Sequence, residues 1–297
     1  MALIFHADDY GLTINQAQRI IALTNSGENK GRLSSVSIFA NSPSFEECAN
    51  LIKPLVDTNE MLLTLHLNIV EGPCCTPACE VPLLVDERGM FNLSFIRVFY
   101  ESNYKKNEDL LVQITLEFIS QIERFLEAFP DQKYTLRLDS HQHFHMIPLV
   151  YHALRLALEN LAIQPDHIRV PIEETSYLKG SPGLIKKIKP VNFAKHKLLS
   201  KLWKQCQKQP IPTNLETNYF CGIMFSGHME DIPDSALSAL NQHALRFGRQ
   251  TEVLYHPIGL DSTEVALDER KKDFVAFHRS PHRKQEAQAL LRPGFPV

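Results

Sequence analysis

The chain has 297 residues, of which 31 are Lys or Arg and 34 are Asp or Glu, so its formal net charge at pH 7 is −3. With 44% hydrophobic and 22% charged residues, the composition is that of a globular protein and excludes the disordered, collagen-like and disulfide-scaffold classes. The near-neutral charge gives no reason to expect a nucleic-acid partner.

The N-terminal segment lacks the pattern of a signal peptide. Met1–Phe5 is apolar but runs directly into a histidine and two aspartates, without a basic start or a cleavage-site pattern. The most apolar stretch, residues 61–70, is interrupted by polar residues and is shorter than the roughly 18 apolar residues of a spanning helix. We therefore expect a soluble, cytoplasmic protein with no membrane span. Its six cysteines, including the cluster of Cys74, Cys75 and Cys79, are expected to be free thiols.

Short apolar segments alternate with longer segments of helical periodicity along most of the chain. Strands are expected at Leu3–Phe5, Leu33–Phe39, Met61–Leu67, Tyr134–Leu138, Ile168–Val170 and Glu252–Tyr255. Helices are expected at about 14–26, 45–56, 108–129, 148–161 and 235–247. Thr13 is placed to cap the first helix, and Pro148 to begin the fourth. This alternation predicts a parallel sheet with crossover helices, either a barrel or an open sheet.

Two segments interrupt the alternation, and both are predicted insertions, near 71–107 and 173–218. The first has few periodic positions and many turn residues, which predicts a long ordered loop; such loops are uncommon unless functional. Within the second, residues 179–208 contain nine lysines and no acidic residue. Interleaved apolar residues predict an amphipathic helix there. Its lysines are expected to form a solvated face, with contact to an anionic substrate or a membrane surface as alternatives.

Three polar clusters each follow a predicted strand: His6–Gly11, Leu65–Asn68 and Asp139–His145. They can converge, because the carboxyl ends of parallel strands face the active site in α/β proteins. Asp8 and Asp9 are adjacent carboxylates, which repel each other unless a cation or a proton separates them. One Asp and two His form a recurring ligand set for a catalytic divalent ion, and the second Asp would then be free to act as a base.

Each cluster also has a structural explanation. The paired aspartates could form a turn or a helix cap, and His66 could be a hydrogen-bonded core residue. His141, His143 and His145 are costly to bury without partners; all three share one side if the segment stays extended, and only one or two reach the site if it bends. His256, at the end of the last predicted strand, is either a capped strand-end residue or a general acid.

Together these motifs resemble the YdjC family of carbohydrate deacetylases. The similar segments keep one order and cover most of the chain: 7–12 with Asn15, 65–67, 139–148, 168–171, 220–229 and 252–257. The resemblance implies a distorted, TIM-barrel-like (β/α) barrel and hydrolysis of an N-acetyl group from an amino sugar or oligosaccharide. Because the candidate site extends from Asp8 to His256, we expect a single domain over residues 1–297.

The resemblance also implies Asp9, His66 and His141 as ligands of one divalent metal ion, usually magnesium, and Asp8 as the base. One carboxylate and two imidazoles are as compatible with zinc as with magnesium, and ligand softness favours zinc or another transition metal in the isolated protein. The metal would activate a water for attack on the acetyl carbonyl and would stabilise the developing oxyanion.

Two further roles complete the expected mechanism. His256, or failing that His145, would protonate the departing amine. Arg169 and His145 are the candidates for substrate contact; Arg169 could hold a hydroxyl, carboxylate or phosphate, or it could form a structural salt bridge.

Two other functions remain open from the sequence. One is a metal-dependent amidohydrolase or phosphoesterase acting on a non-sugar substrate, and the other is a non-catalytic sugar-binding sensor. A homodimer is possible.

Overall fold

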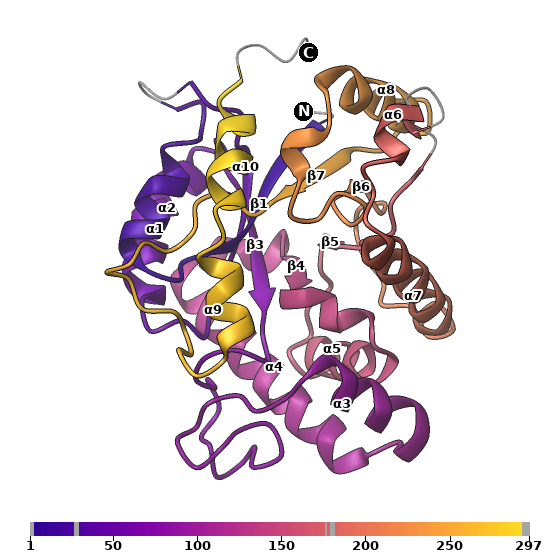
Figure 1. Ribbon diagram of the computed structural model, residues 1–297. Coiled ribbons are helices and arrows are strands. Elements are labelled where there is room, and N and C mark those ends of the chain that lie inside the picture. The colour runs from indigo at the N-terminus through magenta and orange to yellow at the C-terminus, as the bar shows by residue number, and fades with distance from the viewer. Residues whose placement is uncertain (1–2, 27–29, 176, 179–181, 293–297) are drawn as a thin grey trace.

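The computed structural model describes residues 3–26, 30–175, 177–178 and 182–292 (Figure 1). Its centre is a parallel sheet of seven strands, ordered β5-β4-β3-β2-β1-β7-β6. The strands are β1 (Leu3–Tyr10), β2 (Ser35–Ile38), β3 (Leu62–Leu67), β4 (Arg137–Ser140), β5 (His167–Ile168), β6 (Tyr219–Cys221) and β7 (Thr251–Tyr255). The predicted parallel α/β architecture is confirmed.

The sheet curls into a half-barrel. The chain starts in the middle, at β1, and adds β2 to β5 on one side and β6 and β7 on the other. One parallel bridge, between Glu173 and Phe220, links the segment after β5 to β6. This distorted, partly closed barrel directs the carboxyl ends of the central strands toward one another.

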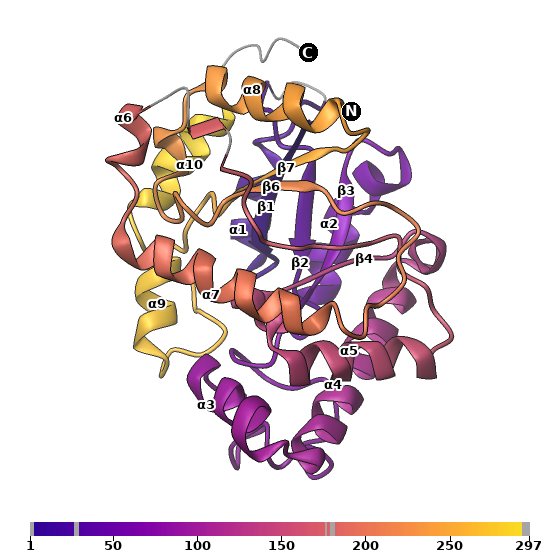
Figure 2. The ribbon, with the colours of Figure 1, turned by 90° about the vertical axis from the view of Figure 1, so that its right-hand side faces the viewer.

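Helices surround the sheet (Figures 1 and 2). The longer ones are α1 (Ile14–Ile21), α2 (Phe45–Asp57), α4 (Glu108–Ala128), α5 (Pro148–Asn160), α7 (Pro190–Cys206), α8 (Asp234–Leu245), α9 (Lys272–His278) and α10 (His282–Leu290). The shorter ones are α3 (Phe95–Tyr100), α6 (Pro182–Ile185), the π-helix η1 (Glu101–Lys105) and the 3-10 turns η2 (Pro130–Tyr134), η3 (His141–Met146) and η5 (Met229–Asp231).

The core explains why these segments fold as they do. β1 is buried over Ile4–Tyr10, as expected for a strand covered on both faces of a parallel sheet. On α4, Ile114, Phe118, Ile122 and Phe125 form one fully buried stripe. Each such side chain contributes about 1.5–3 kcal/mol by leaving water. The apolar residues whose spacing predicted α4 are therefore the residues that the helix buries in the core.

Most predicted elements are confirmed, with shifted ends. Thr13 accepts a hydrogen bond from the amide of Gln16 and caps α1, and Pro148 is the first residue of α5. α1 ends at Ile21, about five residues earlier than expected. β4 starts later than predicted because η2, which begins at Pro130, takes up the preceding residues.

Several elements were not predicted. The segment 71–107 is not entirely a loop, since α3 and η1 lie within it. β6, α6, α9 and α10 were also missed. Strand β6 has only three residues, and α10 is mostly polar, so neither gives a strong periodic signal.

The lysine-rich segment forms the predicted amphipathic helix in α7. Leu199, Leu202 and Cys206 are buried, whereas most lysines of the segment are exposed. Lys195 is the exception among those described, because it is half-buried and lines a cavity together with Asp8 and His141. Lys179 lies outside the described residues. In the parts of the chain that the structure covers, α-helices are too short or too polar to cross a bilayer. All six cysteines are free, as predicted.

Candidate active site

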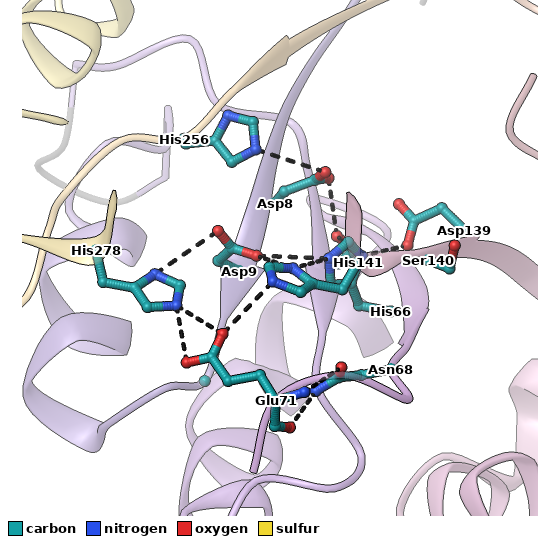
Figure 3. A network of polar contacts seen from close by, with 12 residues as sticks. Asp8, Asp9, His66, Asn68, Glu71, Asp139, Ser140, His141, His256 and His278 are labelled. Atoms are coloured by element: carbon teal, nitrogen blue, oxygen red, sulfur yellow. Dashed lines mark hydrogen bonds and ion pairs between the residues drawn. The ribbon is translucent and has the colours of Figure 1, made fainter. Parts of the chain in front are cut away.

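The polar clusters predicted from the sequence meet at the carboxyl ends of β1, β3 and β4 (Figure 3). His66 pairs in register with Asp139 of the neighbouring strand, and His141 follows directly after β4. β1 supplies Asp8 and Asp9. The carboxyl ends of three strands that lie close together in the sheet thus contribute to one site.

An irregularity at the end of β1 separates the two aspartates. The register with β2 shifts between Ala7 and Tyr10, and Asp9 has a φ of 62°, which few non-glycine residues adopt. Gln16 stabilises this bend, because its Nε2 donates to the carbonyl of Asp9 at 2.8 Å. Such backbone strain costs about 1–3 kcal/mol and is typical of functional sites.

Asp9, His66 and His141 bring three ligand atoms together. Asp9 Oδ1 lies 3.0 Å from His141 Nδ1 and 3.5 Å from His66 Nε2. The two histidine nitrogens are 3.4 Å apart. Ligands bound at about 2.0–2.1 Å in a tetrahedral site are separated by about 3.3 Å, so these spacings fit a single small divalent ion. Asp9 Oδ1 is buried without a hydrogen-bond partner, as expected for an oxygen that faces a metal position.

Two buried carboxylates orient the imidazoles from behind. His66 Nδ1 donates to Asp139 Oδ1 at 2.5 Å, and His141 Nε2 lies 3.5 Å from Glu71 Oε2. Glu71 is in turn held by His278 of α9, whose Nε2 is 3.0 Å from the same oxygen. Carboxylate–histidine pairs of this kind fix the ring orientation and tautomer of metal ligands. Sequence reasoning missed the roles of Glu71 and His278.

The charges of the site favour a bound cation. Burial alone would raise the pKa of Asp9, but the neighbouring His141 and His66 hold it well below its ordinary value. Burial acts against the charged form of both histidines, yet Asp139 and Asp8 raise the pKa of His66 to about 10, and Asp9 raises that of His141 to about 9. Without a metal, protons therefore balance the carboxylates, and a divalent ion would replace those protons.

Asp8 lies beside the ligand cluster in a different environment. Its Oδ1 accepts a hydrogen bond from Ser37 Oγ at 3.0 Å and lies 2.8 Å from Arg169 Nη1. Burial opposes ionisation of Asp8, but Arg169, His66 and His6 keep its pKa well below the ordinary value. Asp8 is therefore an oriented, ionised carboxylate next to the candidate metal-binding group of Asp9, His66 and His141.

Arg169 is fully buried, and its guanidinium forms ion pairs with three buried carboxylates. Nη1 also lies 2.7 Å from Asp139 Oδ2, and Nε donates to Glu252 Oε1 at 2.5 Å. The structure thus favours the salt-bridge alternative over substrate contact for Arg169. The carboxylates of Asp8 and Asp139, which form a second possible ligand group with His6, are thus already paired with this guanidinium.

His145 is likewise enclosed. Its Nδ1 accepts from Ser140 Oγ at 2.6 Å, and its Nε2 donates to the carbonyl of Arg169 at 2.8 Å. Both ring nitrogens are used, so the geometry favours a structural role over the substrate-binding or acid role considered from the sequence. The chain bends at Gln142 and His143, whose φ values are 53° and 59°, so the three histidines do not share one side.

His256 lines a cavity of 190 Å³ together with Asp8, His141, His143 and Lys195. Its Nε2 lies 3.9 Å from Asp8 Oδ2. Burial and the nearby Arg283 lower the pKa of His256 to about 3, so its ring is neutral at pH 7. The cavity also borders Phe274 and Phe277 of α9, which gives it one apolar wall.

Comparison with known proteins identifies the family and several relatives of this chain. The family model described as YdjC-like protein matches residues 2–296. A carbohydrate deacetylase of Danio rerio is 28% identical over 173 residues, which are 58% of this chain and 50% of the relative. A chitooligosaccharide deacetylase of Escherichia fergusonii is 30% identical over 149 residues, 50% of this chain and 52% of the relative. These alignments cover about half the length of the curated relatives.

A solved structure shows the same fold. It comes from Enterococcus faecalis V583 and is described as a proposed cellobiose-phosphate cleavage protein. The two chains superpose with a TM-score of 0.59 over 98% of this chain and 90% of the other, at 18% sequence identity. At that identity the likeness concerns the fold alone.

Proposed function

The chain belongs to the YdjC-like protein family, and from this premise we propose that it is a metal-dependent hydrolase that removes an N-acetyl group from an acetylated amino sugar or oligosaccharide. The observation that carries the proposal is the convergence of one carboxylate and two imidazoles beside a cavity lined by Asp8 and His141. The names of the partly matching relatives, carbohydrate and chitooligosaccharide deacetylases, support the choice of bond and substrate class.

Asp9, His66 and His141 would hold the ion, with Asp139 and Glu71 orienting the two rings. When bound, a divalent ion at this position lowers the pKa of a water and polarises the acetyl carbonyl. Family resemblance favours magnesium, whereas two imidazole ligands favour zinc or another transition metal.

Asp8 is the proposed base that accepts a proton from the attacking water. Arg169 and Ser37 hold its carboxylate ionised and in a fixed orientation. An aspartate whose pKa lies well below 7 releases a proton readily to another group. A candidate acceptor on the cavity side is His256 Nε2, which lies 3.9 Å from Asp8 Oδ2.

His256 is the proposed acid, but its neutral ring must first gain a proton. We infer that the proton leaves water for Asp8, passes to His256, and then reaches the amine nitrogen as the C–N bond breaks. The hydroxyl of the water stays on the acetyl carbon, so the products are acetate and the free amine. The low pKa of His256 makes its protonated ring a strong donor, which suits a poor leaving group such as an amine.

An acetate-release screen tests the proposal. Purified protein is incubated with acetylated amino sugars, their oligomers and their phosphates, with chelator or with added magnesium or zinc. We expect metal-dependent release of acetate and of a free amine in equal amounts, and loss of both in Asp9→Ala.

The same screen separates the two alternatives. Release of phosphate without acetate would favour a phosphoesterase, and hydrolysis of only non-sugar amides would favour an amidohydrolase. Sugar binding without bound metal or acetate would favour a sensor. Any of these results would overturn the proposed deacetylation.

A further inference from the structure

Three side chains of the types that bind metal ions meet outside the proposed active site, between the loop after β6 and the start of α10. They are His228, Glu230 and His282. Glu230 Oε1 lies 3.9 Å from His228 Nδ1 and 3.8 Å from His282 Nδ1. The two imidazole rings are in edge contact, with centroids 4.4 Å apart. His228 and Glu230 lie more than 50 positions before His282, so the fold itself brings the two segments together.

An unpartnered carboxylate oxygen in this cluster points to a missing ligand. Glu230 Oε2 is shielded from solvent and has no hydrogen-bond partner. The side chains of His228 and Glu230 are only 23% and 19% exposed. Leaving such an oxygen unsatisfied costs about 1–3 kcal/mol, which a cation bound by the Glu230 carboxylate can offset.

We propose that His228, Glu230 and His282 form a second metal site, for zinc or a similar transition ion. Two imidazoles and one carboxylate are a recurring zinc ligand set, with a fourth position left for water. The two distances from Glu230 to the histidines are about half an ångström longer than the roughly 3.3 Å edge of a tetrahedral zinc site. Small rotations of these partly exposed side chains can close that gap.

A metal ion at this position would displace one existing hydrogen bond. His282 Nδ1 also lies 2.9 Å from Gln285 Oε1, and metal binding at this nitrogen would replace that hydrogen bond.

The position of the site suggests a structural role. His282 is the first residue of α10, and the next residue, Arg283, donates from Nη1 to the carbonyl of His256 at 3.0 Å. Glu286, one turn further, accepts a hydrogen bond from the amide of His256 at 2.5 Å. An ion at the start of α10 would therefore fix the helix that holds His256 in place.

Zinc stoichiometry tests this proposal independently of activity. Metal-stripped full-length protein is dialysed against zinc, and bound zinc is measured per chain. We expect two zinc ions in the wild type, one in His66→Ala, one in His282→Gln and none in the double variant. His152→Gln, which removes a histidine of α5 far from this cluster in sequence, is the control and should still bind two.

The outcomes separate this site from the active-site metal. If only the active-site assignment fails, the wild type binds one zinc and His282→Gln binds none. If His282→Gln binds as much zinc as the wild type, the second site is wrong. Glu230→Gln should raise the zinc Kd at this site at least about tenfold, and matching circular dichroism of the metal-free variants excludes misfolding. Competition by millimolar magnesium at this site would also contradict the proposal, because imidazole ligands disfavour magnesium.

Discussion

At the scale of residues, the site depends on two adjacent aspartates that do different things. Asp9 lies at a left-handed bend and turns one unpartnered oxygen toward two imidazoles, whereas Asp8 is held by Arg169 and Ser37. The two side chains are chemically identical, so their different surroundings give them different proposed roles. This explains how two like charges can lie side by side near the end of the buried strand β1.

Substitution should separate the two aspartates. Asp9→Ala removes a ligand and should lose both the metal and the activity, whereas Asp8→Asn should keep the metal and lower kcat by roughly 10²–10⁴, the range of a general base. Metal content and kcat are measured on the same preparations. Near-normal kcat in metal-loaded Asp8→Asn would remove Asp8 from the role of base.

Metal affinity should fall with decreasing pH. In the metal-free chain the pKa of His66 is about 10 and that of His141 about 9, so at pH 7 both rings carry protons that the metal must displace. Below these pKa values, each displaced proton weakens the apparent metal affinity about tenfold for every unit by which the pH falls. Two displaced protons together weaken it by up to about 100-fold per pH unit. Titration of metal binding at pH 6, 7 and 8 measures this slope. An affinity independent of pH over that range would show that the two rings are not the ligands.

At the scale of elements, the sequence predicted the helices and strands that are marked by a local pattern of apolar residues. Apolar periodicity identified α4, and the strand ends located Asp9, His66 and His141. Glu71 was missed because it sits at the start of a segment expected to be a loop, although a carboxylate shortly after a strand was a usable signal. His278 lies in a short helix with no strong periodicity, and only the packing of α9 reveals its contact with Glu71.

Helix α7 carries a prediction about its lysines. Lys195 is half-buried and lines the cavity beside Asp8, whereas Lys201 is exposed on the same helix. If Lys195 donates a hydrogen bond to the substrate, Lys195→Ala loses about 1.5–3 kcal/mol of binding in the transition state, a fall in kcat/KM of roughly 10–100-fold.

Lys201→Ala is the matched control and should change kcat/KM less than about twofold, because an exposed lysine contributes little. The two variants are compared on the best substrate of the acetate-release screen. If both variants have the kcat/KM of the wild type, the lysine-rich face does not contact the substrate. That result would agree with the exposure of most of its lysines to solvent.

At the scale of the whole molecule, the site draws on distant parts of one chain. Its residues come from β1, β3, β4, the end of β7 and α9. A domain boundary between any of these elements would divide the ligand cluster from its supporting groups. The arrangement therefore supports the expectation of a single domain, which remains a prediction.

Thermal unfolding with and without metal tests that prediction. A ligand that binds only the folded state at about 100 times its Kd adds about 2.7 kcal/mol, which should raise the Tm of a protein of this size by roughly 5 °C. Using His282→Gln excludes a contribution from the second site, and His66→Ala in the same background should abolish the shift. We expect one transition that moves as a whole, because the metal links β1, β3 and η3 at the centre of the sheet. Two transitions, of which metal moves only one, would instead show that the chain folds as separate units.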